Sequence, residues 1–100
     1  MARYVVLLNW TDQGIKNADK TIDRAAAAKQ AFEKAGGRLS EILWCLGPYD
    51  MICQCEAPDD ETITALSLGL GKLGNVKTTT LRAFTEGEMQ KIIKKASGGK

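Results

Sequence analysis

The segment from Tyr4 to Trp10 is apolar on both of its alternating faces. One face carries Tyr4, Val6, Leu8 and Trp10, and the other carries Val5 and Leu7. A strand that is covered on one side only alternates apolar with polar residues. The pattern therefore predicts a strand that is covered on both faces.

A helical pattern follows this strand after a short stretch of turn-forming residues. Thr11 or Asp12 is the expected N-cap, and Asp19 or Thr21 is the expected restart after a short first turn. Apolar residues then recur at steps of three and four, which predicts one buried stripe. Its members are Ile15, Ala18, Ile22, Ala25, Ala28, Phe32 and Ala35. Gly36-Gly37 is expected to end the helix, because glycine accepts the left-handed conformation found at helix C-termini.

The middle of the chain, Leu43 to Glu56, contains two strand-like runs separated by Gly47-Pro48. Proline presets φ near −65° and glycine tolerates unusual backbone angles, so the pair predicts a tight hairpin turn. The expected strands are residues 38–46 and a second run from Tyr49 onward. The expected faces are Ile42, Trp44 and Leu46 on the first strand, and Tyr49, Met51, Cys53 and Cys55 on the second.

A second helix, a fourth strand and a last helix are expected after the hairpin. Pro58 and the acids after it favour a helix start, and Gly74-Asn75 favours its end. The buried stripe of this helix is Ile63, Leu66, Leu70 and Leu73. Residues 76–84 are rich in β-branched side chains and predict a strand. Thr85 and Glu88 have the spacing of a capping box. It opens a helix with Met89, Ile92, Ile93 and Ala96 on one side, and residues 97–100 are expected to be a flexible tail.

The order β-α-β-β-α-β, plus a C-terminal helix, predicts an α+β, ferredoxin-like fold. Its four-stranded antiparallel sheet would have both main helices on one face. The apolar second face of the first strand is then expected to pack on the sheet of another subunit, giving a homodimer or higher homo-oligomer. The C-terminal helix has too short an apolar stripe to cover that face. It is expected at the rim or on the neighbouring subunit.

Composition and charge exclude several classes of protein. The chain has 100 residues, 44% of them hydrophobic, which suits one domain with one core. Its 14 basic and 12 acidic residues give a net charge of +2 and no footprint for nucleic acid. No apolar run approaches the roughly 20 residues of a membrane span, and no signal peptide is evident. We expect a cytoplasmic protein without nucleic-acid or membrane partners.

Residues with strong catalytic or metal-binding chemistry are few. The chain has no histidine, the commonest general base and metal ligand. Its three cysteines, Cys45, Cys53 and Cys55, have no Cys-x-x-Cys spacing. Buried cysteines mostly behave as small hydrophobes. We therefore expect reduced cysteines, no metal site and no cofactor, with a zinc or redox site as the alternative.

Polar and aromatic residues near the strand ends are the candidates for a ligand site. They are Asn9, Trp10, Asp12, Trp44, Tyr49, Asp50 and Arg82. Asn9 to Asp12 end the first strand, an edge that borders ligand crevices in parallel sheets. The alternative is helix capping beside a core tryptophan. For Asp50 the alternative is a structural role, in which its carboxylate accepts hydrogen bonds from backbone donors of the hairpin.

Arg82 is the charge that most resembles a ligand anchor. It shares a strand face with Thr78 and Thr80, and a guanidinium there could hold a carboxylate or phosphate bidentately. The alternative is a salt bridge within the sheet or between subunits, with Glu41, Asp50 or Glu56 as partner.

Four motifs in order resemble the GYD domain family. They are Asn9-Trp-Thr-Asp-Gln-Gly14, Gly47-Pro-Tyr-Asp50, Glu56-Ala-Pro-Asp-Asp-Glu61 and Gly74-Asn-Val-Lys-Thr-Thr-Thr-Leu-Arg-Ala-Phe-Thr-Glu86. The likeness extends from about Tyr4 to Ile93, and the Gly-Tyr-Asp signature is interrupted here by Pro48. The resemblance implies a single ferredoxin-like domain over residues 1–96 and a dimeric α/β barrel. It implies no particular reaction.

Three classes of function remain open. The preferred one is a non-catalytic small-molecule-binding or sensing domain that acts as a homo-oligomer. The alternatives are a small cofactor-independent barrel enzyme, of the oxygenase or isomerase type, and a structural assembly or adaptor subunit. A pocket lined by Trp10, Trp44 and Tyr49 would favour binding or catalysis, whereas a filled core would favour the structural role.

Overall fold

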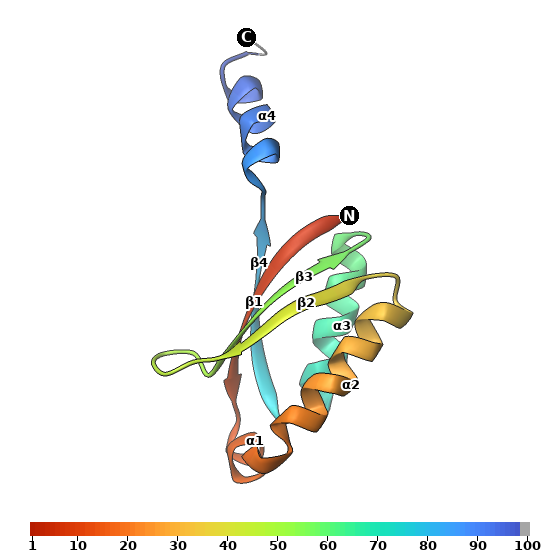
Figure 1. Ribbon diagram of the computed structural model, residues 1–100, viewed down its shortest axis with the longest axis vertical. Helices are drawn as coiled ribbons and strands as arrows, with labels where there is room; N and C mark the ends of the chain where they lie inside the picture. Colours follow the sequence, from red (N-terminus) through yellow and green to blue (C-terminus); the bar gives the residue numbers. More distant parts are fainter. Residues whose placement is uncertain (99–100) are drawn as a thin grey trace.

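A four-stranded antiparallel sheet carries two helices on one face in the computed structural model, which describes residues 1–98 (Figure 1). The elements in chain order are β1 (Ala2–Trp10), α1 (Asp12–Lys16), the 3-10 helix η1 (Ala18–Lys20), α2 (Thr21–Lys34), β2 (Arg38–Trp44), β3 (Met51–Ala57), α3 (Asp60–Lys72), β4 (Val76–Ala83) and α4 (Glu86–Ala96). The sheet order is β2-β3-β1-β4. This is the predicted ferredoxin-like α+β fold. The sheet is open, so one chain by itself does not form the barrel that the resemblance implies.

Within residues 1–98, three helices begin at residues whose side chains accept hydrogen bonds from free backbone N–H groups, whereas α2 begins after Lys20 without a side-chain cap, and neither Asp19 nor Thr21 caps it as expected. The Thr11 side chain accepts a hydrogen bond from the Gly14 backbone N–H at the start of α1, and Asp59 accepts one from Thr62 at the start of α3. The predicted capping box of Thr85 and Glu88 is present at the start of α4.

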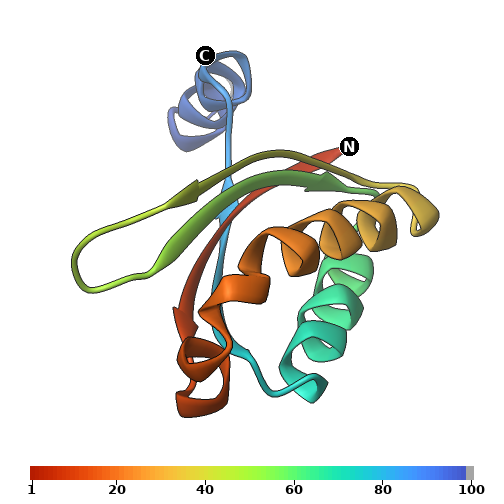
Figure 2. The same ribbon diagram turned by 60° about the horizontal axis from the view of Figure 1, so that its bottom comes forward.

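The core lies between the sheet and the α2–α3 layer (Figure 2). β1 contributes Tyr4, Val6 and Leu8 to it, and β3 contributes Met51, Cys53, Cys55 and Ala57. Phe32, Leu39 and Ile63 complete the buried set. The buried residues of β1 and β3 lie on the predicted faces of these strands, except that Tyr49 lies outside β3.

The stripe predicted for the first helical segment is wrong at its N-terminal end. Ile15 and Ile22 are 57% and 63% exposed, whereas Phe32 is buried. The segment breaks into α1, η1 and α2, so Ile15 and Phe32 do not belong to one continuous helix. Within α2, ten residues at about 100° each place Ile22 about 80° around the helix from Phe32. Leu73, expected in the buried stripe of α3, is also largely exposed.

The hairpin is looser than a two-residue turn. β2 ends at Trp44 and β3 begins at Met51, so residues 45–50 form the loop and Leu46 is fully exposed at its tip. The Asp50 backbone N–H donates to Leu8 O, and the Cys45 N–H donates to Asp50 O. The first bond attaches the base of the loop to β1, and the second closes the loop. Leu46 and Tyr49 therefore lie in the loop and not in the strands that the sequence predicted.

The opposite side of the sheet carries an apolar strip without covering helices, called here the open face. It consists of Val5, Leu7, Leu43, Ile52 and Leu81. The strand register places Leu7 beside Ile52 and Val5 beside Leu81, and Leu43 is paired with Ile52. Leu43 and Leu81 are about half exposed. The open face is therefore apolar, as the pattern of β1 indicated.

Helix α4 lies beyond the end of β4, away from α2 and α3 (Figure 1). The molecule measures 53 × 31 × 19 Å, and its radius of gyration is 15.3 Å. A compact chain of this length has a radius of about 13 Å. The excess reflects this projecting helix, whose Met89 and Ile93 side chains are about half exposed.

Ser97 and Gly98, the described part of the predicted tail, donate backbone hydrogen bonds to the last turn of α4. The Ser97 backbone N–H donates to Ile93 O and Lys94 O, and Ser97 thereby ends α4. The rest of that predicted tail, residues 99–100, lies outside the described residues. Within residues 1–98, no helix combines the length and hydrophobicity needed to cross a bilayer.

Candidate functional site

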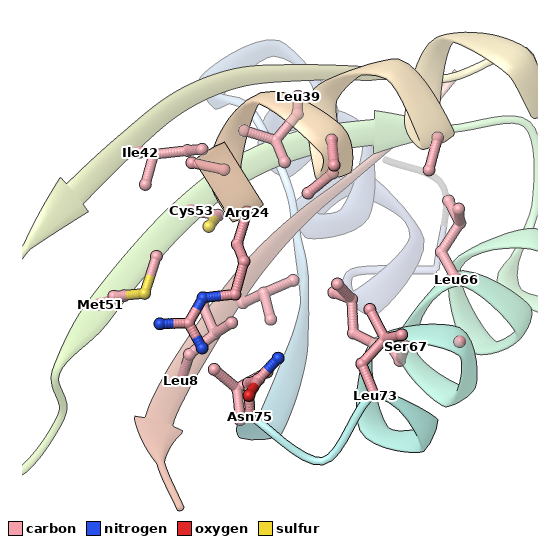
Figure 3. Close-up of a pocket in the computed structure, with 18 of the residues that line it drawn as sticks. Leu8, Arg24, Leu39, Ile42, Met51, Cys53, Leu66, Ser67, Leu73 and Asn75 are labelled. Atoms are coloured by element: carbon pink, nitrogen blue, oxygen red, sulfur yellow. The ribbon is translucent and has the colours of Figure 1, made fainter. Parts of the chain in front are cut away.

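A cavity of about 380 Å³ lies between the sheet and the splayed helices α2 and α3 (Figure 3). Its floor is formed by β1 and β3, with Val6, Leu8, Met51 and Cys53. Its helical walls carry small residues, among them Ala25, Ala28, Ala31, Ala65 and Gly69. These side chains are too short to fill the space between the helices and the sheet. The cavity is therefore a direct product of the alanine-rich sequence of α2.

The polar groups of the cavity include Arg24 and Asn75 (Figure 3). Arg24 comes from α2, and Asn75 follows the end of α3. Arg24 Nη2 donates to Asn17 O at 2.6 Å and to Gly14 O at 3.3 Å. Asn17 is the C-cap of α1, and Gly14 O also accepts a hydrogen bond from the Asn17 N–H. α1 thus fixes the position of the guanidinium.

The two tryptophans lie at or near this cavity. Trp10, at the end of β1, is one of its lining residues. Trp44 Nε1 donates to Thr21 Oγ1 at 3.0 Å, and Thr21 lines the cavity in turn. Of the three aromatic residues considered for a shared pocket, Trp10 lines the cavity, whereas Trp44 and Tyr49 are not among its lining residues.

Asn9 and Asp50 form structural contacts between β1 and the hairpin loop. Asn9 Nδ2 donates to Pro48 O at 2.8 Å, and Asp50 Oδ2 accepts from the Trp10 backbone N–H at 2.9 Å. The structural alternative considered for Asp50 therefore describes its contacts, although the donor lies on β1. Tyr49 and Asp12 are not among the cavity-lining residues, and Asp12 is exposed in the first turn of α1.

Arg82 is not among the cavity-lining residues, and within residues 1–98 it does not form the salt bridge with Glu41, Asp50 or Glu56 that was the alternative within one sheet. Its guanidinium lies over the rings of Phe84 and Tyr4, at 4.5 and 5.6 Å from their centroids. It donates to the backbone carbonyls of Arg3, at 3.2 Å, and Ala83. Glu56, one of its expected partners, instead pairs with Arg3 at 3.0 Å. Stacking on aromatic rings replaces the carboxylate partner.

The cysteines differ sharply in their surroundings. Cys45 is exposed, whereas Cys53 lines the cavity and Cys55 is fully buried. Burial raises the pKa of the Cys53 thiol to about 11. Burial, assisted by the charges of Cys53 and Glu56, raises the pKa of Cys55 to about 11 as well. Residues 1–98 contain no cluster of three or more acidic, cysteine or histidine side chains placed to hold a metal.

Only Cys45 is expected to react quickly with a thiol reagent such as Ellman's reagent at pH 8. The two buried thiols are protonated there and shielded, and the thiolate is the reactive form. Because their pKa values rise from about 9 to about 11 on folding, the folded state holds these protons more tightly. The free energy of unfolding is then expected to fall as the pH rises from 9 to 11.

Cys45→Ser should abolish the fast reaction with Ellman's reagent. Rapid labelling of Cys53 in that variant would contradict the prediction that only Cys45 reacts quickly.

The sequence interpretation missed Arg24 and the alanine wall of the cavity. A signal existed, because Arg24 interrupts the apolar positions between Ile22 and Ala28. It was obscured by the phase of the predicted stripe, which placed Ile22 rather than Arg24 toward the sheet.

The comparisons with known proteins agree with this architecture. The GYD domain family model matches residues 4–93. A protein of Thermus thermophilus, the glutamine synthetase and cystathionine beta-lyase binding protein, is 35% identical over 85 residues, covering 84% of this chain and 90% of the relative. The crystal structure of TTHA0845, also from Thermus thermophilus, covers 85% of this chain and 95% of its own, with a TM-score of 0.54 and 24% identity, a likeness in fold. Since the family match spans nearly the whole described sheet and both helices that cover it, the chain belongs to the GYD domain family.

Proposed function

We propose that the chain is a non-catalytic small-molecule-binding domain that acts as a homo-oligomer. The cavity beneath α2 and α3 is the observation that carries this proposal. Its volume of about 380 Å³ falls in the range of roughly 300–1,000 Å³ that is typical of ligand pockets. Its lining is mostly apolar with a few polar groups, which is also typical of such sites.

The chemistry of the lining supports binding over catalysis. Its ionisable side chains are Arg24 and Cys53. The guanidinium stays charged at any working pH, and burial keeps the Cys53 thiol protonated because its pKa is about 11. Neither group is suited to exchange protons near pH 7, where general acid–base catalysis needs a pKa close to the working pH.

Filling the cavity is expected to abolish ligand binding without unfolding the protein. Ala28 lines the cavity from α2, so Ala28→Leu places a larger side chain in the free space. Ala26 lies on the exposed side of the same helix, and Ala26→Leu is the matched control. The probe is octanoate, followed by isothermal titration calorimetry and thermal unfolding. Octanoate should bind and stabilise wild type and Ala26→Leu, since a ligand that prefers the folded state raises its stability. Equal binding to Ala28→Leu would contradict the proposed site.

The open face supports the homo-oligomer. Its strip of Val5, Leu7, Leu43, Ile52 and Leu81 is apolar and lies between more polar positions of the same face, such as Glu41 and Thr79. A contiguous exposed apolar patch on a soluble domain marks an association site. The partner proposed for it is a second copy of this chain. Sedimentation equilibrium at micromolar concentration tests the assembly, and a mass near the 10.8 kDa of one chain would refute it.

Protein binding is the second candidate function. The Thermus relative is named for binding two enzymes, glutamine synthetase and cystathionine beta-lyase. The surface proposed to meet another protein is the projecting α4, whose Met89 and Ile93 side chains are about half exposed. Sedimentation velocity of the purified chain with its host's glutamine synthetase tests this role.

We also propose a cytoplasmic location, because exposed free Cys45 suits a reducing compartment.

A further inference from the structure

We infer that the cavity takes a small molecule with an apolar body and a single anionic head group, which Arg24 binds at the cavity edge. This inference rests on the proposed function, because it requires the cavity to be a ligand site. It adds the chemical class of the ligand and the residue that selects it.

The position of the Arg24 side chain is the first argument. Arg24 extends from α2 into the space between Leu8 of β1 and Asn75 (Figure 3). Its two bonds to Asn17 O and Gly14 O both come from Nη2. Within residues 1–98, the N–H groups on Nε and Nη1 have no hydrogen-bond partner. The guanidinium is therefore held in place on one side and free to donate on the other.

The charge balance around the cavity is the second argument. Among the described lining residues, Arg24 is the one with a permanent charge, and no carboxylate accompanies it. Nor does any carboxylate in the described part of the chain form an ion pair with it. Asp23 and Lys20 line a second, more open pocket that Arg24 and Asn75 also border, and within residues 1–98 the Asp23 carboxylate forms no ion pair with Arg24. An anionic group at the cavity edge would therefore meet a guanidinium that is not already paired with a carboxylate.

The apolar interior determines the rest of the ligand. Leu8, Phe32, Leu66 and Leu70 line the space beyond Arg24 and present no hydrogen-bonding side chain. A polar body buried there would lose its bonds to water without replacement. The ligand is therefore carbon-rich at one end and anionic at the other, with a carboxylate or a phosphate monoester as the matching head groups.

A set of probes with the same alkyl chain and different head groups tests this class. Octanoate, octyl phosphate, octanamide and octylammonium are titrated into the protein below their micelle concentrations and followed by calorimetry. The anions should bind about 10- to 100-fold more tightly than octanamide, as a charge-assisted hydrogen bond implies. The ammonium compound should bind more weakly than the amide. The ratio of the affinities for octanoate and octyl phosphate identifies the preferred head group.

Variants of Arg24 separate its role in binding from its role in holding α1. Arg24→Gln should reduce octanoate affinity about 10- to 100-fold and leave octanamide affinity unchanged, which also shows that the cavity is intact. Lys29→Gln removes a cation from the exposed side of the same helix and should change neither affinity.

The outcomes also distinguish this inference from the proposed function. Equal affinity for octanoate and octanamide, or an octanoate affinity that Arg24→Gln leaves unchanged, would overturn the inference while the binding function stands. Failure of all four probes to bind would overturn both.

Discussion

Replacing Val6 with aspartate is expected to unfold the subunit at any protein concentration. Val6 is 4% exposed and lies between Cys53 of β3 and Thr80 of β4, on the face beneath the helices. An unpaired carboxylate buried there costs several kcal/mol, which is comparable with the whole stability of a small domain, about 5–15 kcal/mol. Circular dichroism should show loss of both helix and strand signals.

Replacing Val5 with aspartate is expected to abolish association and leave the subunit folded. Val5 lies on the open face, between Gln54 and Leu81. Val5→Asp exposes its charge to water in the isolated subunit, so the fold should persist while association is lost. Sedimentation equilibrium should then give the mass of one chain. An oligomer that survives Val5→Asp would exclude the open face as the contact between copies.

Replacing Gly14 with alanine is expected to destabilise the protein by about 3 kcal/mol, at the upper end of overpacking costs. A Cβ atom at Gly14 would lie 1.9 Å from the backbone oxygen of Asn75. The backbone at Asn75 cannot easily withdraw, because its oxygen accepts a hydrogen bond from the Thr11 N–H and Thr11 Oγ1 donates to Gly74 O. The melting temperature, measured by calorimetry, should fall by roughly 12–24 °C.

Gly71→Ala is the matched control for the Gly14 variant. Gly71 lies within α3, and an added Cβ there meets no atom within 4 Å. Alanine in a helix is favoured over glycine by about 0.5–1 kcal/mol, so this variant should be slightly more stable than wild type. A Gly14→Ala protein as stable as the control would show that α1 can move away from Asn75 without cost.

The architecture was predictable because its signals are local. Alternation along β1 and β3 separates Val6 from Val5, and the Thr85–Glu88 spacing marks the start of α4. These patterns depend on residues near one another in the chain, and they agree with the fold. The hairpin loop was not predictable in the same way, because the bonds that define its base join Asp50 to Leu8 and Trp10, about forty positions away.

The site was predictable only in part, because it too depends on contacts between residues far apart in the chain. Trp10 and Trp44 were marked by their size and position, and both lie at or beside the cavity. Arg24 acquires its role from a cavity that exists only after two distant helices pack against the sheet. Arg82 had the more conspicuous sequence context, but the rings of Tyr4 and Phe84 hold its guanidinium.

The projecting position of α4 means that the subunit does not melt as one unit. This helix has 11 residues, and helices shorter than about 12–15 residues are marginal without tertiary support. Its unfolding exposes none of the core between the sheet and α2–α3, so the two parts have separate free energies of opening. In a lone chain α4 frays first, and its amide hydrogens exchange long before those of β1. If Met89 and Ile93 pack against a second copy, α4 and the rest of the subunit unfold together. The protection of the α4 amides from hydrogen exchange then reports on assembly.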